Sequence, residues 1–269
     1  IVGAGFGLNL FSQSSDSTLI LDQLIQEMLK NNSELQSSQY QTSAAQARIR
    51  QATAWDPPQI GVEFYQTPIQ SFPNPIKDGM ETDYFIQQMF PFPGKLSAMG
   101  QATKNNAGMV EQGYQALKKK IVKELKSAYY ELYLVQHKIQ INAENQDLMR
   151  QFTNIATRQY EVGMGKQLDI LRAQTELSTL SNQGINLQQE KKSAEARLNT
   201  LLNRPIDKQL GYIPDIEIDT TNWTLEQLRP LALENRPEIH AMEFYIKMNE
   251  AELTQVKREY YPDLMLRVM

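Results

Sequence analysis

Few residues of this chain have the types and spacing that catalysis or metal binding would require. His137 and His240 are the only histidines, and neither has a second histidine or an acidic pair at a chelating spacing, so a solvated or packed role is favoured over a metal site. The eleven methionines are scattered along the chain, which does not favour a soft-metal site. The chain has no cysteine, which excludes disulfides, thiolate ligands and a cysteine nucleophile.

The other common signatures of active sites are also missing from the sequence. Gly94-Lys95 lacks the upstream glycine of a phosphate-binding loop. No Ser-His-Asp arrangement or pair of carboxylates stands out, so we assign no catalytic residue, no cofactor and no metal, and we do not expect an enzyme. The net charge of -4 without a clustered basic face does not indicate a nucleic-acid partner.

The most distinctive stretch is Arg158 to Gln174, which predicts the tip of a helical hairpin. Gly163 and Gly165 end one helix, because glycine takes a positive φ at a helix C-terminus without steric cost. Asp169 then lies in the first turn of the next helix, where a carboxylate suits the positive end of the dipole. No proline occurs between Lys95 and Glu161, so the first arm would be roughly 100 Å long, a length typical of coiled coils or helical repeats.

The first arm carries the apolar period of a left-handed coiled coil, with steps that alternate between four and three residues. Met149, Phe152 and Ala156 continue the seam less regularly, and Lys118-Lys119-Lys120 reads as a solvated face. The hairpin is expected over 95–203. The regular part of the seam is Ile121, Leu125, Ala128, Leu132, Val135 and Ile139.

Shorter elements precede and follow the hairpin. Helices are expected over 18–56, one capped by Thr18 and one by Ser33. Strands are expected over 59–67 and 82–90, because Ile60, Val62 and Phe64 alternate with Gly61, Glu63 and Tyr65. Three prolines make Thr67 to Gly79 a loop, and residues 206–223 read as a connector.

The chain then repeats itself at an offset of 204 residues. Nine of the 38 positions from 21 to 58 are identical in the second copy, among them Leu24 with Leu228 and Pro58 with Pro262. A repeat unit of this length indicates a duplication rather than a short solenoid. We therefore expect 18–205 to be one structural repeat and 224–269 to be the truncated start of a second.

The N-terminal segment 1–17 is apolar and small up to Phe11 and turns polar at Ser12. It is interpreted as the remnant of a signal peptide or as a flexible N-terminus. No window of 18 apolar residues occurs in the sequence, so no transmembrane helix is expected.

The order of helices, strand, strand, very long helix, glycine turn, helix and connector resembles the TolC-type outer-membrane efflux proteins, the outer membrane factor family. Tyr160-Glu161-Val162-Gly163 with Leu168 to Gln174 is similar to the tip motif of that family. Phe90-Pro91-Phe92-Pro93-Gly94-Lys95 resembles the turn before the long helix in the branch linked to heavy-metal cation efflux. The resemblance covers nearly all of 18–269.

The resemblance implies a mainly α fold: a long antiparallel coiled-coil hairpin in a periplasmic α-barrel, with a strand pair that joins a trimeric outer-membrane β-barrel. Strands of several chains must close, because an open sheet edge would be unsatisfied in lipid. Ile60, Val62 and Phe64 would then face outer-membrane lipid, and Gly61, Glu63 and Tyr65 the lumen. The location implied is the outer membrane of a Gram-negative bacterium.

The resemblance also assigns a role to the tip. In the family the tip contacts a periplasmic adaptor (membrane fusion) protein that joins the homotrimer to an inner-membrane pump, which makes Val162, Gly163, Met164, Gly165 and Leu168 the expected contact. Glycines allow close backbone approach, and methionine offers an adaptable apolar surface. Asp169 is a candidate for pore gating. The simpler reading is that the glycines only turn the chain and that Asp169 only caps a helix.

Two functions follow from these patterns. The first is a passive export duct in a tripartite efflux system, with heavy-metal cations as the substrate suggested by Phe90 to Lys95. The alternative is a structural coiled-coil scaffold or spacer without channel activity. A scaffold has no use for lipid-facing strands, which favours the duct.

Overall fold

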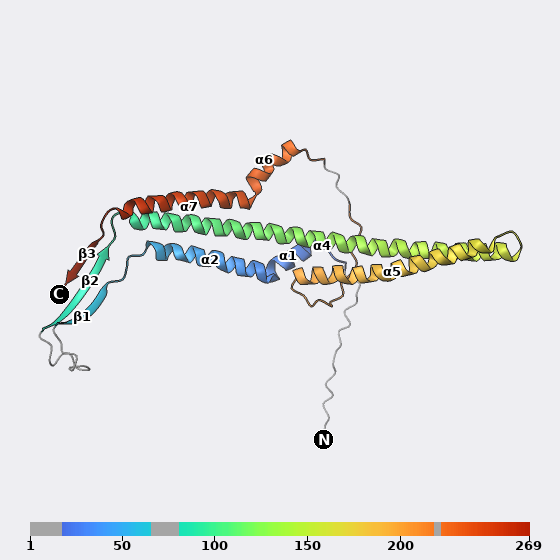
Figure 1. Cartoon of the computed structure of the whole chain (residues 1–269), viewed down its shortest axis with the longest axis horizontal. Helices are drawn as coiled ribbons and strands as arrows, with labels where there is room; N and C mark the ends of the chain where they lie inside the picture. The colour runs from blue at the N-terminus through green and yellow to red at the C-terminus, as the bar shows by residue number, and fades with distance from the viewer. Residues whose placement is uncertain (1–17, 66–80, 218–221) are drawn as a thin grey trace, which may run out of the picture. The chain divides into compact units, whose positions relative to one another are not determined.

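The computed structural model describes residues 18–65, 81–217 and 222–269. The chain forms two compact units. Unit 1 comprises the residues up to Gln36 together with Lys118–Asn222, and unit 2 comprises Ser37–Leu117 and Trp223–Met269. Figure 1 shows the elements of both. The predicted signal segment 1–17 and the proline loop from Thr67 to Gly79 lie outside the described residues, whereas the predicted long helical hairpin with a strand pair is confirmed.

Unit 1 is built on an antiparallel helical hairpin. Its first arm is the part of helix α4 (Lys95–Glu161) from Lys118 onward, and its second arm is α5 (Gln167–Leu201). Figure 1 shows α5 winding along α4. The predicted heptad seam is confirmed from Ile121 to Val135, because its residues on α4 are buried there at alternating steps of four and three, whereas Ile139 is only half-buried. The buried side chains of the seam are Ile121, Leu125, Ala128, Leu132 and Val135 on α4, and Leu187, Ala194 and Leu198 on α5.

Nearer the tip the seam of α4 becomes polar without losing its period. Asn142 is buried, and its amide nitrogen donates to the carbonyl oxygen of Leu180 on the other arm at 3.2 Å. Gly184 lies opposite, where a Cβ would be 3.0 Å from Asn142 Oδ1. The period continues through Met149, whereas Phe152 is 60% exposed. The predicted place of Phe152 in the seam is therefore wrong, because it lies one residue before the heptad position.

The base of unit 1 joins α1 (Leu21–Asn31) to the connector after α5. Gln136 holds that connector from α4: its amide donates to the carbonyl of Gly211 at 3.0 Å and its oxygen accepts from the backbone N–H of Ile213 at 3.1 Å. The buried Tyr129 hydroxyl donates to the Leu19 carbonyl at 3.0 Å. Burial, with a smaller contribution from Tyr130, raises the pKa of Tyr129 above its usual value.

Both predicted helix caps in this region were wrong. The residue before α1 is Ile20, and no side chain caps that helix end, so Thr18 lies too early to act. The next helix, α2 (Ser33–Thr53), begins at Ser33 itself. Its cap is Asn32, whose side-chain oxygen accepts from the Leu35 backbone N–H at 3.0 Å.

Unit 2 contains a three-stranded antiparallel sheet. β1 (Gln59–Tyr65) pairs with β2 (Glu81–Phe90), and β2 pairs with β3 (Leu264–Val268), in the order β1-β2-β3. Ile60 is opposite Ile86, which is opposite Val268, so these side chains share one face. That side of the sheet, the apolar face, also carries Val62, Phe64, Tyr84, Phe90, Leu264 and Leu266, with Thr82 and Gln88 as its polar residues.

The other face of the sheet is mostly polar. Phe85 lies across Gly61, where a Cβ would be only 2.4 Å from the ring. The Arg267 guanidinium lies 4.1 Å from the centre of the same ring and forms an ion pair with Glu63. Gly61 and Glu63 are therefore on the face opposite Ile60 and Val62, as the alternation predicted.

The helices of unit 2 pack through small residues. They are α2 from Ser37, the first part of α4, α6 (Leu225–Asn235) and α7 (Pro237–Glu259). A Cβ on Gly100 would lie 2.4 Å from Thr53, and one on Gly108 would lie 2.7 Å from Phe244, so these helices approach closely at glycine. The buried alanines are Ala45, Ala52, Ala98, Ala102, Ala107 and Ala251. None of the helices in the described ranges carries an apolar stretch long enough to cross a bilayer.

Candidate functional site at the hairpin tip

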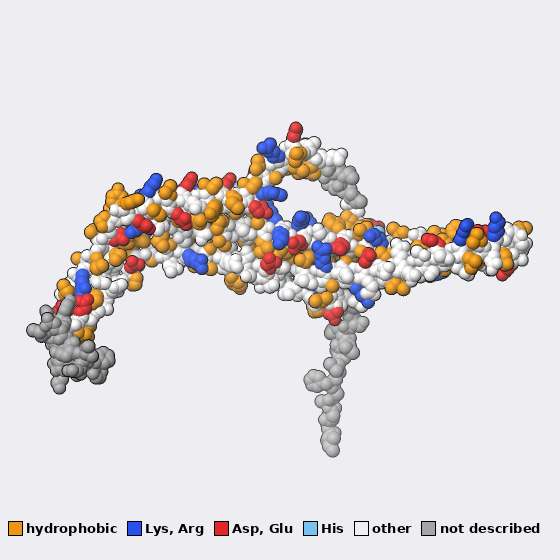
Figure 2. Space-filling model, in the orientation of Figure 1, with side chains coloured by type: hydrophobic (Ala, Val, Ile, Leu, Met, Phe, Trp, Pro, Cys, Tyr) orange, Lys and Arg blue, Asp and Glu red, His pale blue; other side chains and the backbone are white. Residues whose placement is uncertain are grey.

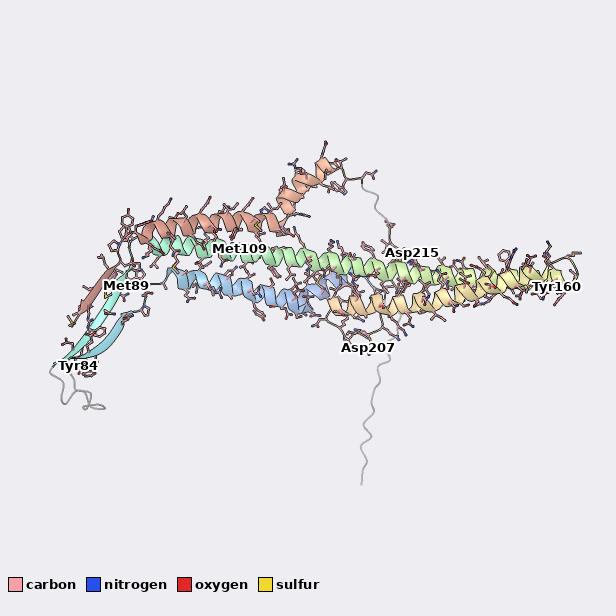
Figure 3. All side chains as sticks on the ribbon, viewed as in Figure 1. Tyr84, Met89, Met109, Tyr160, Asp207 and Asp215 are labelled. Carbon is pink, nitrogen blue, oxygen red and sulfur yellow. The ribbon has the colours of Figure 1, made fainter. Side chains whose placement is uncertain are left out.

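The tip turn of unit 1 has the backbone geometry of a Schellman motif. α4 ends at Glu161, and Gly163 adopts a φ of 76°. The N–H of Gly163 donates to the Tyr160 carbonyl at 2.9 Å, and that of Met164 donates to the Gln159 carbonyl at 2.8 Å. These bonds satisfy carbonyls that the end of the helix leaves without partners. Tyr160, labelled in Figure 3, is in the last turn of α4.

The two positions of the turn favour glycine for different structural reasons. At Gly163 nothing lies within 4 Å of an added Cβ, so only its positive φ disfavours a side chain. At Gly165 an added Cβ would be 2.9 Å from the Tyr160 backbone nitrogen. Gly165 is thus needed for close packing of the turn against the end of α4, whereas Gly163 leaves an open surface beside it.

Three apolar side chains project from this turn into solvent. Met164 is 85% exposed, Val162 is 67% exposed and Leu168 is 52% exposed. The structure therefore brings the predicted contact residues together at one end of the hairpin. An exposed apolar cluster on a rigid turn is suited to contact another protein.

Asp169 lies in the first turn of α5, as expected, but it does not cap the helix. The capping position is Lys166, which makes no side-chain cap hydrogen bond, and Asp169 follows as the third residue of the helix. Its carboxylate thus offers the helix a negative charge beside the positive end of the dipole.

Asp169 also lines a groove between the two arms just behind the tip. The groove has a volume of about 420 Å³. Met149, Phe152 and Ala156 line it from α4, and Asp169, Arg172, Ala173 and Glu176 line it from α5. Sequence reasoning singled out Asp169 but assigned no role to Arg172 and Glu176, and it misplaced Phe152. The available signal was the heptad register, which places Phe152 outside the seam.

A second apolar stripe runs along α4 outside the seam. Leu134, Ile141, Leu148 and Ile155 follow one another at intervals of seven residues and are each 53–55% exposed. Figure 2 shows hydrophobic side chains on the hairpin surface out to the tip. The sequence contained this signal as a second heptad one residue away from the first. A repeat of seven on an exposed helix face is the pattern by which helices associate.

The histidines contact protein groups. In unit 1, His137 lies with Nδ1 3.2 Å from the Tyr133 carbonyl oxygen and Nε2 3.1 Å from Asp215 Oδ1; Figure 3 labels Asp215. In unit 2, His240 Nε2 lies 2.8 Å from the Glu234 carbonyl oxygen. Over the described ranges no group of three or more histidine and acidic side chains could hold a metal ion.

Comparison with known proteins extends this description. The model of the outer membrane efflux protein family matches residues 24–204. No curated protein matches the chain. Among solved structures, the outer-membrane channel OprN is 20% identical with a TM-score of 0.71, and the match covers 92% of this chain and 57% of that one.

Two further structures are similar to the same extent. The outer membrane protein VceC from Vibrio cholerae is 17% identical with a TM-score of 0.71, over 92% of this chain and 61% of that one. CusC, described in a study of folding and transmembrane channel formation, is 19% identical with a TM-score of 0.75, over 96% of this chain and 62% of that one. The chain thus spans about three fifths of the length of these structures.

Proposed function

The chain belongs to the outer membrane efflux protein family, and on that premise we propose that it forms part of a passive export duct in the outer membrane of a Gram-negative bacterium. In this duct the sheet of unit 2 lies in the membrane and the hairpin of unit 1 lies in the periplasm. The duct itself performs no chemistry, and the energy for export comes from an inner-membrane pump.

The observation that carries the proposal is the segregation of the two sheet faces. The apolar face leaves Ile60, Tyr84 and Ile86 more than half exposed, although a soluble protein would normally cover such a surface. The opposite face carries the Glu63–Arg267 ion pair. A sheet with one apolar and one polar side suits a barrel wall between lipid and a water-filled lumen.

The edges of the sheet support assembly from several chains. β1 and β3 are the outer strands of the described sheet, and an open edge in lipid would leave backbone groups without partners. Closure by strands of neighbouring chains removes that cost, in line with the homotrimer that the family resemblance implies. The stripe of Leu134, Ile141, Leu148 and Ile155 gives the hairpin a surface for packing against a neighbour.

The tip is the proposed contact with a periplasmic adaptor protein. Val162, Met164 and Leu168 provide the exposed apolar surface, and the open space around Gly163 allows a partner backbone to approach. The groove lined by Phe152, Asp169 and Arg172 lies next to this surface. Asp169 is proposed to contribute to pore gating through its charge.

Heavy-metal cations are the proposed cargo. The support is the Phe90-Pro91-Phe92-Pro93-Gly94-Lys95 stretch, which resembles the corresponding turn of the branch linked to such efflux. Loss of tolerance to heavy-metal cations, but not of tolerance to organic toxins, on deleting the gene would support this cargo.

The membrane location can be tested with single cysteines, because residues 1–269 contain none. Ile86 and Gln87 are neighbours on the central strand and lie on opposite faces. In the full-length protein in vesicles, a fluorophore on Ile86→Cys should be quenched by brominated lipid, and one on Gln87→Cys by aqueous iodide. Equal quenching of both by iodide would refute membrane insertion and favour a coiled-coil scaffold.

Assembly and docking need separate measurements. The full-length protein in detergent should have the mass of a trimer after the detergent contribution is subtracted. Met164→Glu should abolish crosslinking to the adaptor without changing that mass, because it places a charge on the apolar tip. Ile206→Glu is the matched control, since Ile206 is also exposed but lies in the connector. Unchanged crosslinking with Met164→Glu would remove the tip from the docking surface.

A further inference from the structure

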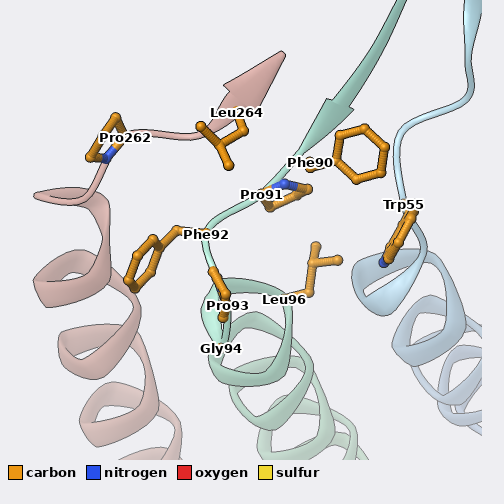
Figure 4. Close-up of a pocket in the computed structure, with 9 residues that line it drawn as sticks. All are labelled: Trp55, Phe90, Pro91, Phe92, Pro93, Gly94, Leu96, Pro262 and Leu264. Carbon is orange, nitrogen blue, oxygen red and sulfur yellow. The ribbon is translucent and has the colours of Figure 1, made fainter. Parts of the chain in front are cut away.

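An apolar groove lies in unit 2 where the strands give way to helices. Its walls are Trp55 after α2, the turn 90–94 between β2 and α4, Leu96 in α4, and Pro262 with Leu264 at the start of β3. Its volume is about 430 Å³, which is within the range of small-ligand sites. Figure 4 shows Leu96, Phe90 and Leu264 around the same space. The family resemblance gives this groove no role.

The groove continues the apolar face of the sheet. Phe90 and Leu264 are register partners on β2 and β3, so their side chains point to the same side. This is also the side of Ile86 and Leu266. A molecule that covers the apolar face can therefore extend into the groove, passing Gln88, the one polar β2 side chain between Ile86 and Phe90 on this side.

Aromatic side chains surround the groove in the manner of a membrane interface. Trp55 packs edge-on against Phe90 with ring centres 5.5 Å apart, and Phe92 stacks on Tyr261 at 4.5 Å. Tyr260 and Tyr261 are both more than half exposed. Tryptophan and tyrosine gather where hydrocarbon meets the polar headgroups, because their rings are apolar and their N–H or O–H groups are polar.

Cationic groups stand beside the turn that forms one wall. Lys95 Nζ lies 2.9 Å from Asp263 Oδ2, and Arg258 Nη1 donates to the Pro93 carbonyl at 2.9 Å. An added Cβ on Gly94 would fall 2.0 Å from Arg258 Nη1, so the guanidinium lies directly against the turn. Lys95 is paired with Asp263, so the Arg258 guanidinium is the cation beside the turn that can complement a phosphate.

We propose that this groove binds a membrane phospholipid, with an acyl chain between Trp55, Leu96 and Leu264 and the phosphate near Arg258. The inference rests on the proposed function, which places the apolar face in the outer membrane. The lipid is the occupant that the continuity with that face, the aromatic surround and the positive charge all favour. Its binding would fix the depth at which the sheet passes into the helices.

The test uses the full-length protein in vesicles of phosphatidylethanolamine and phosphatidylglycerol that contain a tracer phospholipid with a diazirine at the end of one acyl chain. After illumination and digestion, adducts are mapped by mass spectrometry. Tandem mass spectra assign each adduct to a residue, because Ile86 and Phe90 lie on one tryptic peptide. Adducts at Trp55 and Phe90 are expected, together with adducts at Ile86 on the exposed apolar face. Leu264→Trp should reduce labelling at Trp55 by about fivefold or more, because the larger side chain displaces hydrocarbon from the groove.

Leu266→Trp is the matched control, since Leu266 is on the same strand and the same face but does not line the groove. It should leave labelling at Trp55 unchanged. Labelling at Ile86 without labelling of the groove would overturn the proposal and leave the membrane location intact. No labelling at either place would refute the proposed function, and the lipid site with it.

Two further outcomes decide the remaining cases. Equal labelling at Trp55 in wild type and Leu264→Trp would overturn the proposal, because the adducts would not come from an occupied groove. If Leu264→Trp fails to insert, which loss of labelling at Ile86 would reveal, Leu96→Phe replaces it, since Leu96 narrows the groove from the helical side. Reduced labelling at Trp55 with normal labelling at Ile86 is then the supporting result.

Discussion

The guanidinium of Arg204 and the carboxylate of Glu27 form two parallel hydrogen bonds between residues 177 positions apart. Arg204 Nε lies 2.7 Å from Glu27 Oε1, and Nη2 bonds to Oε2. The Arg204 and Glu27 side chains are 18% and 31% exposed. This bidentate geometry, the strongest form of an Arg–carboxylate contact, ties the end of the hairpin to α1 within unit 1.

Arg204→Gln should therefore destabilise unit 1 by about 1–2 kcal/mol, because one partner of a half-buried charged pair is lost. The measurement is the midpoint of urea unfolding followed by circular dichroism. Arg197→Gln is the matched control, since Arg197 pairs with Glu131 at 2.7 Å but both side chains are about half exposed. Arg197→Gln should lower the free energy of unfolding by about 0.5 kcal/mol or less. Equal effects of the two substitutions would contradict the expectation that the more buried ion pair contributes more to stability.

Asp263 should make the junction between α7 and β3 sensitive to acid. The hydrogen bond from Lys95, followed by that from the Phe92 N–H, lowers the pKa of Asp263 below its usual value. The ionised carboxylate is thus favoured in the folded state. Its contribution to stability is complete above the ordinary pKa of about 3.9 and is lost as the pH falls through the lower folded pKa.

The comparison of wild type with Asp263→Asn between pH 2 and 7 checks this sign. Their thermal midpoints should differ at neutral pH, and the difference should shrink below about pH 4. Asp207→Asn, at an exposed residue of the connector in unit 1, is the control, because it removes a carboxylate without removing the contacts of Lys95 and Phe92 to Asp263. If the difference in thermal midpoint between wild type and Asp263→Asn grew as the pH fell, the lowered pKa of Asp263 would be contradicted.

The hairpin was predictable because its information is local and periodic. The run from Ile121 to Val135 repeats at a fixed interval, and Gly163 has one common role at a helix end, so neither depends on distant contacts. The alternation of Ile60 and Val62 with Gly61 and Glu63 fixed the sheet faces in the same way.

The details that failed depend on contacts that the local sequence does not specify. Asn142 occupies a seam position because Gly184 and the Leu180 carbonyl lie opposite it. Asn32 and Ser33 are both good capping residues, so composition could not choose between them. The groove at Leu96 requires Trp55 and Leu264, which are distant in sequence from each other.

Asn203 should tolerate glycine better than alanine. It ends α5 with a φ of 55°, and the Arg204 N–H donates to the Asn199 carbonyl at 2.9 Å, as in the turn at Gly163. Asn203→Gly should change stability by about 0.5 kcal/mol or less, because glycine suits this conformation but loses the side-chain contact to the Asn31 carbonyl. Asn203→Ala should cost about 1–2 kcal/mol, because alanine must also adopt the left-handed conformation. Urea unfolding of the two variants distinguishes them, and equal losses would show that the side-chain contact matters more than the backbone.

The two tip glycines should respond in opposite ways to small substitutions. Gly163→Asn should preserve the turn, because asparagine tolerates a positive φ and nothing lies within 4 Å of its Cβ position. Gly165→Ala should distort the turn, because its Cβ would lie 2.9 Å from the Tyr160 backbone nitrogen, which a rotamer change cannot relieve. Hydrogen exchange at the Met164 amide reports directly on the turn, since that amide donates to the Gln159 carbonyl.

Protection of that amide should remain near wild type in Gly163→Asn and fall about tenfold or more in Gly165→Ala, which corresponds to a loss of about 1.4 kcal/mol. Adaptor crosslinking through Met164 reports on both the geometry of the turn and the exposed surface beside Gly163. If the tip docks as proposed, Gly165→Ala should weaken crosslinking through the altered turn, and a bulky side chain at Gly163 should weaken it by occupying the open surface. Loss of protection in Gly163→Asn but not in Gly165→Ala would show that the positive φ, rather than the close backbone approach, determines the shape of the tip.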